Sequence, residues 1–324
     1  MQKMTNSNIT ADSIPELGKK RDKGFKNNAP YYIMLAPFFL LFALFTILPV
    51  LSSVVLSFFD FDAVSLPRFA GLDNYMRIFV QDDVFPKALS NTLTLAIVTG
   101  PIGFLLAFML AWMVNEFGPK TRTVLSFLFY SPALAGNVYF IWQILFSGDA
   151  YGYINSTLLS LGLIVEPVQW LKNASYMLPI ICAVQLWMSM GVTFLSNISG
   201  LQNVNPELYE AGAIDGVRNR WHELWYITIP SMKNIMMFGV VMQIQSAFSI
   251  SAVPIALCGY PSVNYAADTI VSLITDVGTS RYEMGYAAAL SVILFILMSL
   301  TKELLGKLVN MAGGEKNAGY INVI

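Results

Sequence analysis

Charged residues are scarce in this chain. They make up 12% of its 324 residues, against about 25% in an ordinary soluble domain, whereas hydrophobic residues make up 56%. The mean hydropathy is +0.59. This composition argues against an ordinary soluble domain and is typical of an integral membrane protein.

Histidine, cysteine and nucleotide-binding signatures are also nearly missing. The sequence has one histidine, His222, and two cysteines, Cys182 and Cys258, with no C-x-x-C pair. This leaves no basis for a histidine-centred triad, a clustered metal site or a disulfide scaffold. The phosphate-binding pattern G-x-x-x-x-G-K-[ST] does not occur, so the chain is not expected to hydrolyse ATP. We therefore predict a non-catalytic protein with no metal or cofactor of its own.

Long apolar runs are abundant. A membrane-crossing helix needs about 20 predominantly apolar residues, and six runs in the sequence come near or exceed that length. None has Asp, Glu or Arg at its centre, where a charge costs about 2.5–3.5 kcal/mol. We predict an all-α integral membrane protein with six transmembrane helices over residues 31–59, 89–114, 124–146, 176–198, 232–255 and 286–305.

Polar tails flank these runs. Residues 1–29 are predicted to form a mostly disordered tail, residues 30–310 the six-span membrane domain and residues 311–324 a second tail. Pro37 and Pro49 predict that the long first span is kinked or begins at the membrane interface. The weakly apolar stretch 154–165 is too short to span a bilayer and is expected to form an external interfacial helix.

Basic residues are distributed unequally between the two sides of the predicted membrane domain. With the N-terminus in the cytoplasm, fourteen of the nineteen Lys and Arg residues lie on the cytoplasmic side and five on the opposite side. Cytoplasmic loops of membrane proteins typically carry such an excess. Both termini, and segment 205–230, are therefore expected to be cytoplasmic.

Segment 205–230 is the most polar long stretch between two apolar runs. Asn205 is a good N-cap and Pro206 suits the first helical position, so a helix is predicted to begin here. Gly216 is predicted to end it. A second short helix is predicted from the spacing of Trp221 and Thr228 with the apolar residues between them.

The same segment resembles the cytoplasmic coupling loop of ABC-importer permeases. That loop has Glu-Ala-Ala, three residues, Gly, nine residues, Ile, one residue and Leu-Pro. Here residues 210–212 (Glu-Ala-Gly), Gly216 and residues 227–230 (Ile-Thr-Ile-Pro) follow this pattern. Gly212 replaces the usual second Ala, and because Gly inside a helix costs about 1 kcal/mol relative to Ala, a looser helix is predicted. Ile229 replaces the usual Leu.

Other stretches resemble the sugar-transporting branch of these permeases. They include residues 71–75 (GLDNY), Trp142 with the following Gly152 and Asn155, and residues 282–289 (YEMGYAAA). The resemblance covers most of residues 31–310. The whole chain is also similar to the permease of an alginate-type polysaccharide importer, although no single motif carries that likeness. Neutral oligosaccharides and glycerol-phosphate-type substrates are the alternatives.

The resemblance implies a multi-pass permease subunit of the bacterial inner membrane, with the type I ABC importer fold and an alternating-access mechanism. It implies four partners: an ABC ATPase dimer that binds ATP and Mg²⁺, a second six-span permease, an extracytoplasmic solute-binding protein and a saccharide. No nucleic acid is expected. The residues implied to couple to the ATPase are Glu207, Tyr209, Glu210, Ala211, Gly212, Asp215 and Gly216, with Glu210 near a basic group of the ATPase cleft.

Polar residues within the spans are candidates for a substrate pathway, because amides, hydroxyls and flat aromatic rings suit a sugar. These candidates are Tyr139, Trp142, Gln143, Gln185, Ser189, Thr193, Gln245 and Ser249. The same residue types also pack helices together, through hydrogen bonds worth about 0.6 kcal/mol each, so the two interpretations stay open.

Two other interpretations compete with an importer subunit. Segment 205–230 could be an amphipathic helix that lies on the bilayer and couples to nothing. A channel or secondary transporter that works alone is the alternative function, but such proteins typically carry a functional ionisable group inside the membrane, and the centres of these spans contain none.

Overall fold

The structure is a computed structural model that describes residues 29–136, 138–188 and 190–312. Nearly all of both predicted tails, together with the pathway candidate Ser189, lies outside these residues. The chain divides into two compact units, Met1–Ser52 and Ser53–Ile324.

The described part of the first unit is one apolar helical stretch. It consists of α1 (Ala29–Phe42), a π-helical turn η2 (Ala43–Ile47) and the start of α2 (Leu48–Leu56), which continues into the second unit. Residues Tyr31–Leu56 are long and apolar enough to cross a membrane. Pro49 has no N–H to continue the regular helical ladder, and the widened turn lies directly before it. Pro37 lies inside α1, and the kink or interfacial start stays a prediction.

The second unit is almost wholly helical. Its described strands form one small antiparallel sheet, β1 (Phe59–Asp60) and β2 (Arg68–Phe69), in which Phe59 pairs with Phe69. The helical elements, in chain order, are α3 (Asp73–Met76), η3 (Arg77–Gln81), α4 (Val84–Asn115), α5 (Pro119–Leu134), α6 (Phe140–Leu145), α7 (Tyr153–Ser160), α8 (Ala174–Met188), α9 (Met190–Gln202), α10 (Pro206–Ile214), α11 (Arg220–Glu223), η4 (Leu224–Thr228), α12 (Ile229–Ser231), α13 (Lys233–Phe248), α14 (Ala252–Cys258), η5 (Val263–Tyr265), α15 (Ile270–Thr275), η6 (Asp276–Ser280) and α16 (Met284–Ala312).

Five of the six predicted spans correspond to helical stretches with the length and composition needed to cross a membrane. In the second unit these stretches are Phe85–Asn115, Ala174–Gln202, Lys233–Cys258 and Met284–Lys307. Together with Tyr31–Leu56 they account for every predicted span except the one over 124–146.

The prediction of one continuous helix over 124–146 is incorrect. This part of the chain forms two separate helices, α5 and α6. Pro132 removes a backbone donor from the last turn of α5, and the hydroxyl of Ser131 donates to the carbonyl oxygen of Leu128 at 2.8 Å. Ala135 then adopts an extended backbone (φ −85°, ψ 98°), which ends the helix. An apolar run contains little sign of such a break.

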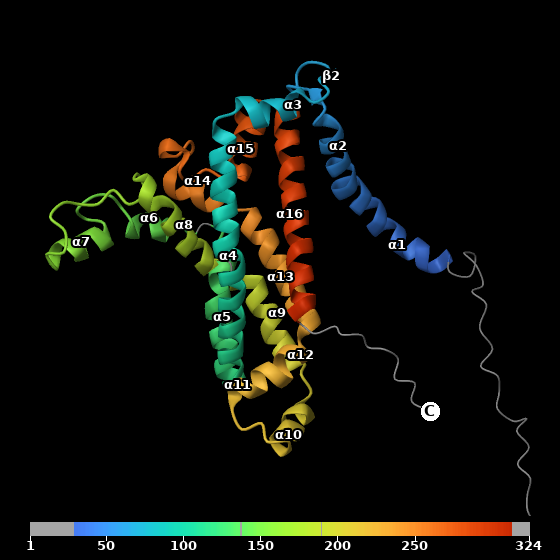
Figure 1. Cartoon of the computed structure of the whole chain (residues 1–324), viewed down its shortest axis with the longest axis vertical. Helices are drawn as coiled ribbons and strands as arrows, with labels where there is room; N and C mark the ends of the chain where they lie inside the picture. The colour runs from blue at the N-terminus through green and yellow to red at the C-terminus, as the bar shows by residue number, and fades with distance from the viewer. Residues whose placement is uncertain (1–28, 137, 189, 313–324) are drawn as a thin grey trace, which may run out of the picture. The chain divides into compact units, whose positions relative to one another are not determined.

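Helix α4 lies at the centre of the second unit, where it packs against α8, α9, α13 and α15 (Figure 1). Its buried face carries small residues at helical spacing, including Gly100, Gly103, Ala107 and Ala111. Small residues let membrane helices approach one another closely. One end of the unit holds α10, α11 and α12, and the other holds α3 and α15 (Figure 1). We call these the α10 end and the α3 end.

A short apolar helix at the α3 end was not predicted. Helix α15 and turn η6 together cover Ile270–Ser280, which is too short to span a membrane. Thr92 of α4 accepts a hydrogen bond from the backbone N–H of Ile270 at 2.9 Å, and Asn91 Nδ2 donates to the carbonyl oxygens of Tyr265 and Asp268, both at 2.9 Å. Helix α7 overlaps the stretch 154–165, where a helix was predicted. Its interfacial location stays a prediction.

Candidate functional site

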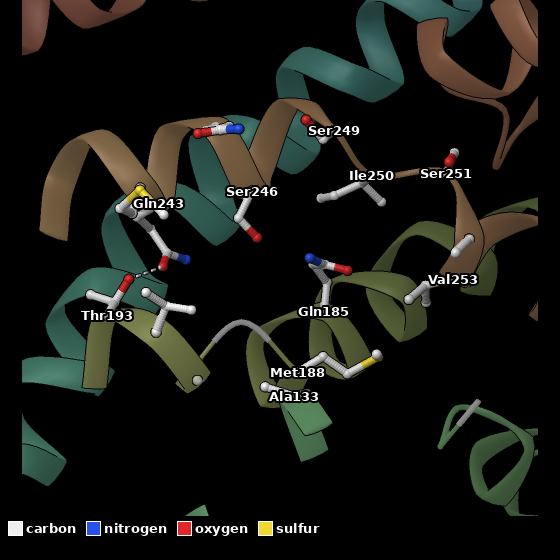
Figure 2. Close-up of a pocket in the computed structure, with 15 residues that line it drawn as sticks. Ala133, Gln185, Met188, Thr193, Gln243, Ser246, Ser249, Ile250, Ser251 and Val253 are labelled. Carbon is white, nitrogen blue, oxygen red and sulfur yellow. Dashed lines mark hydrogen bonds between the residues drawn. The ribbon is translucent and has the colours of Figure 1, made fainter. Parts of the chain in front are cut away.

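A cavity of about 460 Å³ lies inside the second unit, bordered by α8, α9, α13 and the start of α14 (Figure 2). Its described lining includes no charged side chain. The polar part of the lining consists of amides and hydroxyls: Gln185, Thr193, Gln243, Gln245, Ser246, Ser249 and Ser251. We call it the polar cavity.

The helical backbone is interrupted beside the polar cavity. Helix α13 ends at Phe248 and α14 begins at Ala252, while Ser251 between them has a non-helical backbone (φ −146°, ψ −39°). At membrane depth, irregular backbone is tolerated where it is buried in protein or lines a water-filled cavity. The break therefore fits the polar cavity beside it, and it brings the hydroxyls of Ser249 and Ser251 to the lining.

The structure brings together four of the eight predicted pathway residues. Gln185, Thr193, Gln245 and Ser249 all line the polar cavity, although they come from different helices. Ser189 lies outside the described residues, between α8 and α9. Ser246 and Ser251 were not predicted: helical spacing from Ser249 could have indicated Ser246, whereas Ser251 lies in a break that no periodicity reveals.

Tyr139, Trp142 and Gln143 lie elsewhere. Tyr139 and Trp142 belong to a partly buried apolar cluster, in which the Trp142 ring packs 5.5 Å from that of Trp187. The side-chain amide of Gln143 donates to the carbonyl oxygen of Ala256 in α14. These three residues hold α6 against its neighbours and do not line the polar cavity.

Thr193 and Gln185 differ in what their polar groups contact. Thr193 is 2% exposed, and its hydroxyl donates to Oε1 of Gln243 at 3.2 Å. Gln243 Nε2 donates in turn to the carbonyl oxygen of Thr99 in α4 at 3.1 Å. Thr193 is therefore used in helix packing. The side-chain amide of Gln185 has no hydrogen-bond partner among the described residues. It points into the cavity, as does the hydroxyl of Ser246 (Figure 2).

The second candidate site is segment 205–230 at the α10 end. The predicted N-cap is present, because Asn205 Oδ1 accepts a hydrogen bond from the backbone N–H of Glu207 at 3.1 Å. Gly216 follows the helix with φ +91°, in the left-handed region that favours glycine. Asn219 caps α11 in the same way, by accepting from Trp221 N at 3.1 Å, and this second cap was not predicted.

The inner side of α10 packs against η4. The Tyr209 hydroxyl donates to Thr228 Oγ1 at 3.0 Å, since Thr228 itself donates to the carbonyl oxygen of Glu223. Gly212 is buried, and a Cβ added there would lie 2.6 Å from Cδ1 of Ile227. The glycine was expected to loosen the helix. The structure gives it a packing reason, because the Ile227 side chain of η4 occupies the space that a Cβ would need.

The outer side of α10 is exposed. Glu207, Glu210 and Ala211 lie on it, and the two large apolar side chains nearby, Leu208 and Ile214, are 45% and 87% exposed. Asp215 and Gly216 continue this surface. The helix thus presents carboxylates and apolar groups together, while its tyrosine and buried glycine face its own chain.

Arg220 fixes the segment to the end of α4. Its guanidinium contacts Glu223 at 2.7 Å and Glu116, directly after α4, at 2.9 Å. The hydrogen bond to Glu223 raises the pKa of Arg220 above its usual value. The rings of Trp112 in α4 and Trp221 in α11 also pack with centroids 5.2 Å apart. None of these contacts was predicted; those to Glu116 and Trp112 join positions more than 100 residues apart.

Residues 100–308, which contain both sites, match the family described as the binding-protein-dependent transport system inner membrane component. The chain belongs to this family. The predicted role of an ABC transporter permease subunit is thereby confirmed. This permease is accordingly a membrane component of a transport system.

Two relatives of the permease are named for sugar transport systems. It is 29% identical over 314 residues to the arabinooligosaccharides transport system permease protein AraP of Bacillus subtilis, which covers 94% of the permease and 97% of AraP. It is 32% identical over 214 residues to the lactose transport system permease protein LacF of Rhizobium radiobacter, which covers 65% of the permease and 70% of LacF.

A solved structure shares the fold. The permease resembles a chain from the crystal structure of a bacterial ABC transporter involved in the import of the acidic polysaccharide alginate, with a TM-score of 0.72 and 22% identity. The similarity covers 88% of the permease and 96% of that chain. The predicted ABC-importer permease fold is therefore confirmed at the level of architecture.

Proposed function

We propose that the permease forms half of the translocation pathway of an ATP-driven saccharide importer in a bacterial inner membrane. A second six-span permease would supply the other half, and an extracytoplasmic solute-binding protein would deliver the saccharide. A dimer of ABC ATPases would bind ATP and Mg²⁺. In this arrangement both termini and the α10 end face the cytoplasm, in agreement with the excess of Lys and Arg in the loops on that side.

The observation that carries the coupling role is the exposed surface of α10. An 87% exposed Ile214 beside Glu207 and Glu210 is what a docking helix presents to a cleft with apolar walls and a basic rim. A helix lying on the bilayer would instead direct apolar side chains to lipid and basic ones to water, and α10 contains no Lys or Arg. We name residues 205–230 the coupling segment.

The polar cavity is the proposed pathway of this half. Gln185, Gln245 and Ser249 supply the amide and hydroxyl groups that can exchange hydrogen bonds with a sugar. Because the described lining has no cation, it suits a neutral oligosaccharide better than a carboxylated one, whose charge would need a partner. Relatives named for arabinooligosaccharides and lactose agree with this choice. An acidic polysaccharide is the second candidate, favoured by the alginate importer of similar fold.

Transport would follow from the connection between the two sites. ATP binding draws the ATPases together and moves both coupling segments with them. Because Arg220 and Trp221 tie the segment to the end of α4, this motion reaches the helices around the polar cavity. The cavity then opens on alternate sides of the membrane.

Co-purification tests this function. The permease would be tagged and expressed with its chromosomal neighbours, and the co-purifying proteins identified by mass spectrometry and assayed for ATPase activity. We expect an ATPase and a second permease, with ATP hydrolysis stimulated by a saccharide-loaded binding protein. Recovery of a homo-oligomer that transports in liposomes without ATP would support a stand-alone transporter and overturn the proposal.

A further inference from the structure

A second cavity, of about 500 Å³, lies at the far end of α14 from the polar cavity. Ala252 and Val253, at the start of α14, line the polar cavity, whereas Leu257 and Cys258, at its end, line the second one. The seven residues of α14 rise by about 10 Å. The other lining residues come from the end of α6 and the two arms of the following loop: Gln143, Phe146, Ser147, Gly148, Asp149, Gln169, Leu171 and Lys172. We call it the outer cavity.

One buried side chain holds the two arms of this loop together. Asn155 is 0% exposed, and its Nδ2 donates to the carbonyl oxygens of Ser147, Asp149 and Val168 at 3.0–3.1 Å. Its Oδ1 accepts from Val168 N at 3.2 Å and from Trp170 Nε1 at 2.8 Å. The wall of the outer cavity is thus pre-organised, which lowers the entropic cost of binding a ligand.

Glycine is required at one point of this wall. A Cβ added to Gly152 would lie 2.4 Å from the carbonyl oxygen of Ser147, which is closer than atoms can approach. Gly152 and Asn155 are among the residues that resemble sugar permeases, and the proposed pathway gives neither of them a role. The outer cavity explains both, because together they shape its wall.

The outer cavity also has an aromatic side. Phe146 lines it, and the ring of Phe146 is held between that of Trp142, stacked at 6.0 Å, and that of Trp170, at 6.1 Å in an edge-on arrangement. The amide of Gln143 anchors α6 to α14 through the carbonyl oxygen of Ala256. An immobilised ring beside polar groups offers a flat surface for the C–H face of a sugar.

Donors and acceptors remain available around this ring. The side-chain ammonium group of Lys172 has no partner among the described residues and carries three donors. Gln169 uses Nε2 to donate to the carbonyl oxygen of Gly148 at 2.7 Å, which leaves its Oε1 and its second N–H. Asp149 Oδ1 accepts from Tyr151 N and Gly152 N, which leaves Oδ2. Neighbouring sugar hydroxyls, which both donate and accept, need such a mixture.

We propose that the outer cavity is a saccharide-binding subsite outside the main pathway, which holds a sugar unit before it passes along α14 into the polar cavity. This inference rests on the proposed importer function. Phe146 packs on the ring face of the sugar, while Asp149, Gln169 and Lys172 bind its hydroxyls.

The test uses the complete importer in nanodiscs without its binding protein. Binding of arabinotriose, lactose and an alginate trisaccharide is measured by saturation-transfer-difference NMR, and the same sugars on the binding protein are assayed for ATPase stimulation. In Gln169→Ala and Lys172→Ala, the affinity for the stimulating sugar is expected to fall about three- to fivefold, as for the loss of one hydrogen bond. Glu166→Ala, an exposed carboxylate of the same loop outside the cavity, is the control and should bind normally.

Each result has a distinct meaning. Unchanged sugar binding in both variants would overturn the subsite while leaving the importer function intact. A weaker response to loaded binding protein without any change in free-sugar binding would also overturn it, by assigning the outer cavity to contact with that protein. A wild-type complex that no sugar stimulates would overturn the proposed function and this subsite together.

Discussion

The coupling segment is one continuous stretch of 26 residues, whereas the residues around the polar cavity come from positions 133 to 253. The segment contacts its own chain on one side and exposes carboxylates and apolar groups on the other. The described residues that line the cavity come from several helices, and their polar groups divide into those that bond one another, such as Thr193 and Gln243, and those left free, such as the side-chain amide of Gln185. The proposed function assigns the first site to an outside partner and the second to a solute.

Reversing the charge at Glu210 should have the largest effect. If the exposed Glu210 faces a basic group of the ATPase, Glu210→Lys places like charges together, which costs several kcal/mol, and uptake should fall by more than about tenfold. Uptake and saccharide-stimulated ATPase activity would be measured at matched membrane levels. Glu166→Lys, on the loop after α7, is the charge-matched control. Normal uptake by a well-expressed Glu210→Lys variant would contradict the coupling role of the segment, and with it the functional difference between the two sites.

Gly216→Pro tests whether the outer surface depends on the turn after α10. Proline fixes φ near −65°, which conflicts with the φ of +91° observed here, and such a mismatch costs more than about 1 kcal/mol. Uptake should fall about five- to tenfold. Gly118→Pro, which is on the α4–α5 connection at φ −61°, is the control and should retain activity. Equal losses in both variants would argue for general instability.

Substitutions at Gln185 and Thr193 should distinguish a role in the substrate pathway from a role in helix packing. Gln185→Leu removes a free amide from the cavity, so uptake should fall about fivefold through the loss of about 1 kcal/mol of hydrogen bonding to the sugar, with the melting temperature unchanged. Thr193→Val breaks the bond to Gln243 and should destabilise the complex by about 0.6 kcal/mol with little effect on uptake. Uptake kinetics and thermal unfolding in detergent would show both. The reverse pattern would exchange the two roles.

Exchanging charges across Arg220 and Glu116 should have a smaller effect. Both side chains are exposed, and such ion pairs are worth about 0.2–1 kcal/mol, so Arg220→Glu should lower sugar transported per ATP hydrolysed by about two- to threefold. Glu116→Arg combined with Arg220→Glu should restore part of that ratio. Failure of the double variant to exceed both single variants would show that this ion pair does not transmit motion.

Gly212→Ala should have the smallest effect. The added methyl meets only the end of the Ile227 side chain, which can move, and alanine favours the helix by about 1 kcal/mol, so the two effects nearly cancel. Ile227→Ala relieves the contact, and the double variant should have a higher melting temperature than Ile227→Ala alone. A large loss of uptake in Gly212→Ala would mean that the spacing between α10 and η4 is critical.

Features fixed by the local sequence could be predicted, whereas features fixed by packing between distant helices could not. The cap at Asn205, the turn at Gly216 and five of the six spans follow from local chemistry or composition, and these predictions agree with the structure. The break between α5 and α6 depends on Pro132 and the backbone beyond it, which an apolar run conceals. The separation of Gln185 from Trp142 depends on how distant helices pack. Spacing along one helix cannot give that information.

Helix α4 connects the coupling segment with the α3 end. Its 32 residues extend about 48 Å. Glu116, directly after one end, forms an ion pair with Arg220. Near the other end, Asn91 and Thr92 form hydrogen bonds with the backbone just before α15 and at its first residue. The helix therefore has one contact point at the coupling segment and another beside the loop that follows the outer cavity. A displacement at the α10 end would thus reach the α3 end along one continuous helix, so the two ends of this subunit would need no separate signal.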